Sequence, residues 1–156
     1  MSAAASDAPR DERLLTFEIG RALYALPISG IVEVTEVEEG IAAVPTLPAQ
    51  TGGVINFHGD ALPVLRAEAL LGVEGGELGS PVQIVVVTDG PAEKALLGLP
   101  VNDVLGLANG ARAIARGADP VAERRSIDGR VVSILDPARL VTRAASVIES
   151  ARGDSE

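Results

Sequence analysis

An internal repeat is the feature that most constrains how this chain folds. Residues 53–72, GVINFHGDALPVLRAEALLG, have the pattern of two strands joined by a turn near Gly59 and followed by a short helix. The same pattern recurs without a gap in residues 127–140, IDGRVVSILDPARL, where Gly129 stands 70 positions after Gly59. A pattern repeated in the same order at a fixed offset indicates a duplicated unit.

A second pair of segments supports the duplication. Residues 27–31 (PISGI) and 100–104 (PVNDV) match at an offset of 73, so each half carries the same elements in the same order. Apolar runs bounded by Gly, Pro and polar turn residues predict strands in both halves. The expected strands are 14–20, 22–27, 31–37, 54–57, 62–65, 81–88, 94–100, 101–107, 121–127 and 130–135.

The composition favours strands packed into small barrels. Aromatic residues make up only 2% of the 156 residues, so Val, Leu, Ile and Ala must fill the core. Because β-branched side chains favour strands, this composition suits two small barrels that share a core. The length is sufficient for one compact domain of this kind.

Charge and cysteine content limit the partners. With 13 Lys and Arg against 22 Asp and Glu, the net charge is −9, which repels a phosphate backbone and an anionic membrane alike. We therefore expect no nucleic-acid partner. The absence of Cys excludes disulfides and thiolate catalysis and is compatible with the cytoplasm. No run is apolar and long enough for membrane insertion.

The organisation along the chain follows from the same pattern. Residues 1–12 are small and polar and predict a disordered tail, and residues 73–80, VEGGELGS, predict a linker. The folded domain is expected over 13–149, with a first barrel at about 13–72, a second at about 81–149 and strand sharing possible between them. Residues 108–120 are expected to form a loop. A closing helix is expected from Asp136-Pro137, and a flexible tail from residue 150.

Residues capable of catalysis are sparse. His58 is the single histidine, and neither a Gly-x-Ser-x-Gly nucleophile motif nor a phosphate-binding glycine loop occurs. A turn position for His58 favours an exposed surface residue. The pattern therefore favours a binding module in which a groove between two barrels takes a partner, with Glu33 or His58 orienting it. A small hydrolase using His58 as base is the alternative from another class.

Four segments taken in order resemble the CheW-like family of chemotaxis coupling proteins. They are 17–34 (FEIGRALYALPISGIVEV), 52–65 (GGVINFHGDALPVL), 98–104 (GLPVNDV) and 133–141 (SILDPARLV). The resemblance implies a mainly β fold of two tandem SH3-like, five-stranded β-barrels, related by a pseudo-twofold axis and sharing a core, with a C-terminal helix. It also implies a non-catalytic cytoplasmic adaptor, without metal or cofactor. Its expected partners are the regulatory domain of a CheA-type histidine kinase and the cytoplasmic tip of methyl-accepting chemoreceptors.

The resemblance also implies two sets of site residues. By motif position, the apolar kinase-docking edge would include Leu15, Ile28 and Ile31. The receptor groove would include Glu33, Gly52, His58, Gly98 and Asn102.

Two of these positions depart from the family pattern. His58 stands where family members commonly have Arg, and Asn102 where they commonly have Asp. An imidazole thus replaces a permanently charged, forked donor, and a carboxylate is lost or shifted by one position. We therefore expect a variant coupling protein serving a specialised pathway with its own receptor or kinase. The second hypothesis is a CheW-like component that binds the receptor but no kinase.

Overall fold

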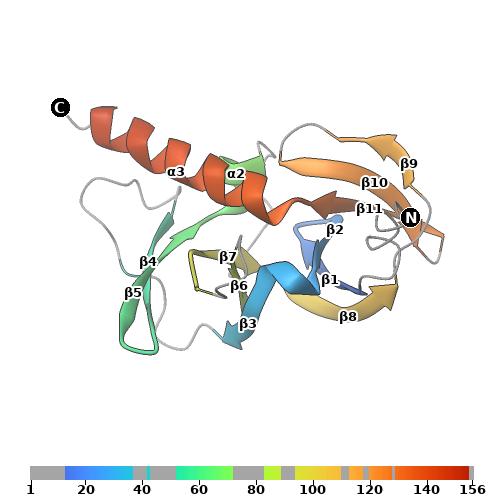
Figure 1. Cartoon of the computed structure of the whole chain (residues 1–156), viewed down its shortest axis with the longest axis horizontal. Helices are drawn as coiled ribbons and strands as arrows, with labels where there is room; N and C mark the ends of the chain where they lie inside the picture. Colours follow the sequence, from blue (N-terminus) through green and yellow to red (C-terminus); the bar gives the residue numbers. More distant parts are fainter. Residues whose placement is uncertain are drawn as a thin grey trace, which may run out of the picture.

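A computed structural model of the chain describes residues 13–36, 42, 52–71, 83–88, 94–109, 113–117, 120–127 and 129–154. The expected tail at 1–12 and linker at 73–80 lie outside these residues. The described strands form two sheets, with the β4–β5 hairpin at one end of the molecule and β9 to β11 at the other (Figure 1). The prediction of a mainly β fold with a C-terminal helix is confirmed.

The larger sheet has six strands in the order β8-β1-β2-β11-β10-β9. Their bounds are β1 Arg13–Ile19, β2 Ala22–Pro27, β8 Asp103–Asn109, β9 Ala113–Arg116, β10 Val121–Ile127 and β11 Arg130–Leu135. This sheet has one edge strand more than the expected five, because β9 forms inside the expected loop at 108–120. β9 is a short edge strand that pairs with β10, and its pattern is too short to indicate a strand by periodicity.

The smaller sheet has five strands in the order β3-β6-β7-β5-β4. Their bounds are β3 Ile31–Glu36, β4 Gly52–Phe57, β5 Asp60–Leu65, β6 Gln83–Val87 and β7 Leu97–Val101. The order matches that of the larger sheet without β9 when each strand is replaced by its counterpart in the other repeat. β3 corresponds to β8, β6 to β1, β7 to β2, β5 to β11 and β4 to β10. This correspondence is the relation that a pseudo-twofold axis requires.

Each sheet draws strands from both repeats. The first hairpin, β1–β2, pairs with β8 and β11 of the second repeat, and the corresponding hairpin strands β6 and β7 pair with β3 and β5 of the first. The expected segments 13–72 and 81–149 therefore describe the two repeats along the chain and not the two sheets. The strand sharing that the sequence left possible extends to both first hairpins.

The register also follows the repeat. β5 and β11 are offset by 70 residues over their whole length and share one burial pattern, with buried residues at the third and last two positions. Val64 of β5 lies beside Gly98 of β7 in a parallel pair, and its equivalent Ile134 lies beside Ala25 of β2. Equivalent residues therefore occupy equivalent places in the two sheets.

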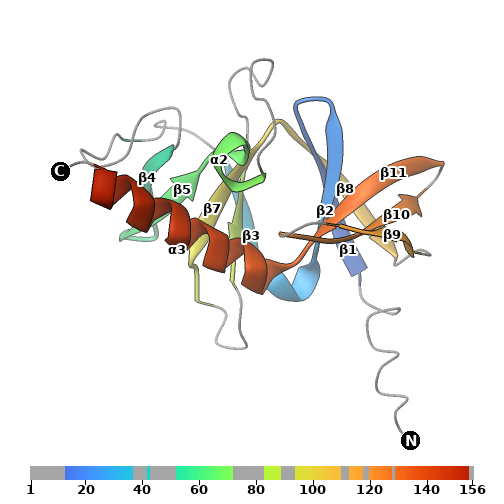
Figure 2. The ribbon, with the colours of Figure 1, turned by 90° about the horizontal axis from the view of Figure 1, so that it is seen from above.

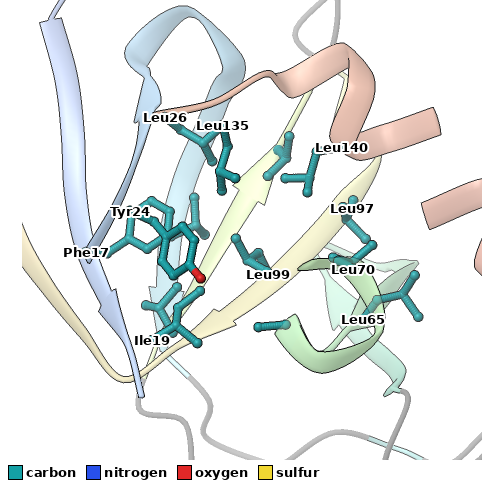
Figure 3. Packing of buried hydrophobic residues seen from close by; sticks show 14 of the residues in the cluster. Phe17, Ile19, Tyr24, Leu26, Leu65, Leu70, Leu97, Leu99, Leu135 and Leu140 are labelled. Carbon is teal, nitrogen blue, oxygen red and sulfur yellow. The ribbon is translucent and has the colours of Figure 1, made fainter. Parts of the chain in front are cut away.

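Three clusters of buried residues hold the sheets together. One lies within the smaller sheet and contains Leu62, Val64, Ile84 and Val86; another lies within the larger sheet and contains Leu14, Ala25, Val132 and Ile134. The central cluster joins the two sheets and the helices, with Phe17 and Tyr24 stacked at one side, Leu97, Leu70 and Leu140 at the other, and Leu99 between them (Figure 3). Burial raises the pKa of the Tyr24 phenol, while the nearby Arg124 charge acts in the opposite direction.

Two helices cover the central cluster. The short helix α2 (Ala67–Leu71) and the closing helix α3 (Pro137–Asp154) contact each other, and α3 runs along the side of both sheets (Figure 2). The Asp136 carboxylate accepts a hydrogen bond from the Arg139 N–H at 3.2 Å, as expected of an N-cap. α3 extends to Asp154, so residues 150–154 of the expected tail are helical. Within the described residues, no helix is both long and apolar enough to cross a membrane.

Candidate docking site

The β4–β5 turn presents His58 in an uncommon backbone conformation. His58 and Gly59 have φ angles of 53° and 91°, the pair of positive values that a two-residue type I′ hairpin requires. The Asn56 side-chain oxygen accepts a hydrogen bond from the Gly59 N–H at 2.8 Å. Non-glycine residues rarely adopt this conformation, although His is among those that do so more often. The turn therefore fixes the direction in which the imidazole leaves the hairpin.

The imidazole of His58 joins the hairpin to β3. Its Nε2 lies 3.2 Å from the Glu33 carboxylate oxygen Oε1, and its ring contacts the Phe57 ring edge-on with centroids 4.3 Å apart. The side chains are 69% exposed for His58 and 41% for Glu33. Two residues that the sequence assigned to the receptor groove are thus in direct contact and accessible to a partner.

The Glu33–His58 contact connects the two edges of the smaller sheet. β3 and β4 are the first and last strands in its order, so a contact between β3 and the β4–β5 turn requires the sheet to curl. The interior of the curl is filled by the cluster around Val64, with Val32 of β3 and Phe57 of β4 packed against it. The contact therefore joins the two edges of the curled sheet, although no strand pairing links β3 to β4 in the described residues.

Gly52 and Gly98 are buried and shape the smaller sheet from within. A Cβ atom on Gly52 would overlap the Val64 carbonyl oxygen of the adjacent strand. A Cβ on Gly98 would lie 2.9 Å from Ile84 Cγ2 and 3.0 Å from Val64 Cγ2, closer than ordinary carbon contacts. Both residues support the site through backbone packing rather than through an exposed surface.

Asn102 lies at the corner where β7 leaves the smaller sheet and β8 enters the larger one. Its side-chain oxygen accepts a hydrogen bond from the Gly20 N–H at 2.6 Å, and its own N–H donates to the Glu18 carbonyl at 2.9 Å. These contacts tie the corner to the β1–β2 hairpin. The structure thus brings Glu33 to His58, while the described hydrogen bonds of Asn102 are made elsewhere.

The three residues expected at the kinase-docking edge differ in exposure. Leu15 of β1 and Ile31 of β3 are half-buried and pack against the central cluster. Ile28 lies in the one-turn helix η2 (Ile28–Gly30), which contacts β1, and is 39% exposed. Of the three, Ile28 offers the most apolar surface to a partner.

Sequence reasoning missed the exposed leucines of β8. Leu105 is 46% and Leu107 56% exposed, while Val131 of β11 is 57% exposed. The sequence pattern of β8 correctly predicted a strand, but the repeat aligns its leucines with Val32 and Val34, which are half-buried and pack against the clusters of the other half. Leu105 lies at the register shift between β1 and β8, where the regular alternation of a strand is interrupted, so alternation alone does not indicate its exposure.

The site offers little for catalysis. An imidazole next to a carboxylate can act as a base, yet the His58 contacts in the described part of the chain are with Glu33 and Phe57 rather than with a nucleophile. No group of three or more potential metal ligands occurs among the residues that the structure describes. The hydrolase hypothesis gains no support from this geometry, which fits a surface for protein contacts.

Comparisons with known proteins agree with the fold. The model of the CheW-like domain matches residues 13–145. A chemotaxis protein CheW from Treponema pallidum (strain Nichols) is 32% identical over 54 residues, which span 35% of this chain and 31% of that protein's length. The crystal structure of the scaffolding protein TtCheW from Thermoanaerobacter tengcongensis superposes with a TM-score of 0.67 and 22% identity, covering 81% of this chain and 85% of the other. Since the family model matches residues 13–145, which include the strands of both sheets, the chain belongs to the CheW-like domain family.

Proposed function

We propose that this protein is a cytoplasmic adaptor that couples chemoreceptors to a CheA-type histidine kinase in a signalling array. The Glu33–His58 contact at 3.2 Å is the observation that carries the proposal. The two polar side chains, both assigned to the receptor groove by motif position, lie together on an exposed surface where the edges of the smaller sheet meet. A contact between two accessible side chains can be exchanged for contacts with a partner at little cost.

The receptor surface in this proposal consists of Glu33 and His58, with the half-buried Phe57 ring supporting the imidazole. A receptor tip is a helical hairpin, so an exposed carboxylate beside an imidazole would supply oriented hydrogen bonds to it. Gly52 and Gly98 act from beneath by allowing the strands of this barrel to pack closely. Asn102 acts more remotely, by fixing the corner between the two sheets.

The kinase surface in this proposal centres on Ile28. Ile28 is 39% exposed and so leaves apolar area on η2. Leu15 of β1 and Ile31 of β3 are half-buried on the neighbouring strands. Apolar anchors of this kind contribute most to protein–protein binding when a partner covers them completely. The regulatory domain of the kinase is the proposed occupant.

The substitutions at His58 and Asn102 support a specialised variant of the coupling role. Glu33 contacts the imidazole here, where a guanidinium would hold the carboxylate through a permanent charge. The carboxylate is therefore held less firmly and is more available to a partner. A receptor adapted to this surface would present a donor to Glu33, and a standard receptor tip would bind less well.

The second candidate is an array component that binds the receptor but not the kinase. The burial of Leu15 and Ile31 favours it, since it leaves Ile28 as the main exposed apolar residue among the three. A kinase-docking edge needs a contiguous apolar patch.

Calorimetric titration of the full chain against each partner from the same organism tests the proposal. The partners are the kinase regulatory domain and a receptor hairpin-tip fragment. We expect both to bind, Glu33→Arg to weaken the receptor fragment alone and Ile28→Glu to weaken the kinase domain alone.

Matched controls separate these surfaces from general charge effects. Glu36→Arg changes an exposed acid on the same strand as Glu33, and Val131→Glu changes an exposed apolar residue of the other sheet. Both should leave the two affinities unchanged. Binding to the receptor alone would establish the second candidate, and binding to neither would refute both.

A further inference from the structure

The one-turn helix η2 turns Ile28 outward at a place where the other repeat keeps a residue in the core. At the 73-residue offset that relates the two repeats, Ile28 corresponds to Val101, which is buried in the central cluster. The chain leaves β2 at Pro27 and forms η2, which is closed by a hydrogen bond from the Ile31 N–H to the Ile28 carbonyl. The exposure of Ile28 therefore depends on how η2 is held.

Gly30 seats η2 directly against the first turn of α3. The two elements lie side by side in both views of the ribbon, with η2 in light blue and α3 in red (Figure 1, Figure 2), and Gly30 is buried. A Cβ atom on Gly30 would overlap Pro137 Cγ and lie 2.8 Å from Pro137 Cβ. The φ angle of Gly30 is not positive, so an alanine could adopt this backbone conformation. The close approach to Pro137 is therefore what requires glycine here.

Contacts on both sides keep η2 and α3 from separating. The Gly30 carbonyl accepts a hydrogen bond from the Thr88 N–H at 2.9 Å, and Thr88 is buried at the end of β6. Asp136, just before α3, donates its N–H to the Pro120 carbonyl at 3.0 Å. Leu140, in the first turn of α3, is fully buried in the central cluster. Since neither side can retreat without breaking hydrogen bonds or moving the core, added volume at Gly30 must displace η2.

The corresponding corner of the other repeat is built without this close approach. Gly30 corresponds to Asp103, which has an exposed side chain at the start of β8. Asn102 fixes that corner through its side chain instead, by accepting a backbone N–H of the β1–β2 hairpin. The fold therefore does not need a glycine packed under a helix at this corner, and the contact of Gly30 with α3 is specific to the half that carries η2.

We propose that Gly30 and Pro137 are positioning residues for the kinase-docking surface, because their close packing holds η2 so that Ile28 projects from the protein. This inference rests on the proposed function, in which Ile28 is the apolar anchor for the kinase regulatory domain. An anchor contributes most where it enters the partner in one fixed orientation, since any freedom must be lost on binding. The first turn of α3, which belongs to the second repeat, thus sets the geometry of a surface on the first repeat.

Calorimetric titration of the full chain with the kinase regulatory domain tests this role. Gly30→Ala should weaken binding about tenfold, as truncation of an interface anchor does, while the affinity for the receptor fragment stays unchanged. Adding Pro137→Gly should bring the kinase affinity back to within about threefold of the wild type, because the new Cβ then fills the space left by the ring. Gly117→Ala is the matched control: its Cβ would overlap Val121 between β9 and β10 at the far edge of the larger sheet, so it should leave both affinities unchanged.

A thermodynamic cycle with Ile28→Ala separates positioning from a general loss of structure. Because Gly30 acts through Ile28, Gly30→Ala should cost less than about twofold further in a chain that already carries Ile28→Ala. An equal loss of kinase affinity in both backgrounds would overturn the proposal. Unchanged kinase affinity of Gly30→Ala, or a matching loss in Gly117→Ala, would overturn it as well.

Amide hydrogen exchange of the free chain keeps this inference separate from the proposed function. Gly30→Ala should speed exchange of the Thr88 N–H about tenfold by displacing its acceptor, while the Asn102 N–H, which donates to the Glu18 carbonyl at the equivalent corner, stays unchanged. A wild-type chain that binds no kinase domain, with Thr88 exchange responding as expected, would refute the coupling function and support the role of Gly30 in holding η2. Unchanged Thr88 exchange would overturn the positioning role whatever the kinase result.

Discussion

Replacing Gly98 by Ala should destabilise the smaller barrel measurably. The new Cβ would lie 2.9 Å from Ile84 Cγ2 and 3.0 Å from Val64 Cγ2, against about 3.5–4.0 Å for relaxed carbon contacts. Both neighbours are fully buried and β-branched, so neither can rotate away without disturbing a stiff χ1 angle. The strain must therefore be taken up by the sheet.

The expected magnitude is a balance of two effects. Overpacking a well-packed core costs about 1–3 kcal/mol, while replacing Gly in a strand gains about 0.5–1 kcal/mol of reduced unfolded-state entropy. The free energy of unfolding should fall by about 1–2 kcal/mol. For a domain of this size that corresponds to a melting temperature lower by about 2–8 °C, measurable by circular dichroism in thermal and urea unfolding.

The duplication supplies a reciprocal control. Ala25 is the counterpart of Gly98 in the larger sheet, where it lies beside Ile134 and is fully buried. Ala25→Gly should also destabilise, by about 1–2 kcal/mol, through the loss of a buried methyl group and the added flexibility of glycine. A Gly98→Ala variant as stable as the wild type would refute the packing argument. If Gly98→Ala were as stable as the wild type and yet lost receptor binding, Gly98 would be a contact residue and not a packing residue.

Three further predictions concern single side chains. His58→Ala should lower the free energy of unfolding by less than about 1 kcal/mol, because the contact with Glu33 is exposed; a larger loss in urea unfolding would mean that the contact holds the barrel closed. Asn102→Ala should cost about 1 kcal/mol or more through the lost hydrogen bond to the Gly20 N–H, and amide hydrogen exchange at Gly20 should rise. Burial raises the pKa of Tyr24 above its unfolded value, so its contribution to stability is complete below the unfolded pKa of about 10 and is lost as pH rises through the folded pKa. Since the chain has one tyrosine and no tryptophan, an ultraviolet titration follows the ionisation of Tyr24 alone. A Tyr24 pKa in the folded protein equal to or lower than that in the unfolded chain would contradict this prediction.

Most of the fold could be predicted because local signals and the repeat agree. The paired turns at Gly59 and Gly129 have φ angles of 91° and 80°, and the glycines that identify them in the sequence are required for that geometry. The N-cap at Asp136 was predicted on equally local grounds. Such features depend on neighbouring residues alone, and the sequence contains all of them.

The exchange of strands could not be predicted from the same signals. Whether β1 and β2 pair with β8 and β11 or with strands of their own repeat depends on contacts between residues far apart in the chain, such as Leu15 with Leu107. The repeat makes the two alternatives almost equivalent in pattern, because each strand has a counterpart with the same periodicity. What distinguishes the two ways of pairing the strands is the central cluster, to which both repeats contribute buried residues.

The expected site residues stay a prediction, although the structure shows how they are arranged. Motif position assigned Glu33 and His58 to one groove, and the structure brings them into contact. It also assigned Gly52 and Gly98 there, although both are buried. A motif reports that a residue is needed at a position, and a residue can be needed for packing beneath a surface as well as for contact on it.

The two sheets have one origin and differ where function requires it. In the smaller sheet Ile55 and Phe57 fill the interior and Glu33 meets His58 across the edge. At equivalent places the larger sheet has Arg125, paired with Glu123, Ile127, which keeps an apolar side chain on the inner cluster, and Gly106. Arg125 thus puts a charge where Ile55 fills the smaller sheet, and Gly106 lacks the carboxylate with which Glu33 reaches the opposite edge. The polar contact that joins the two edges of the smaller sheet therefore has no counterpart at Gly106, so the two sheets share one order of strands but present different surfaces.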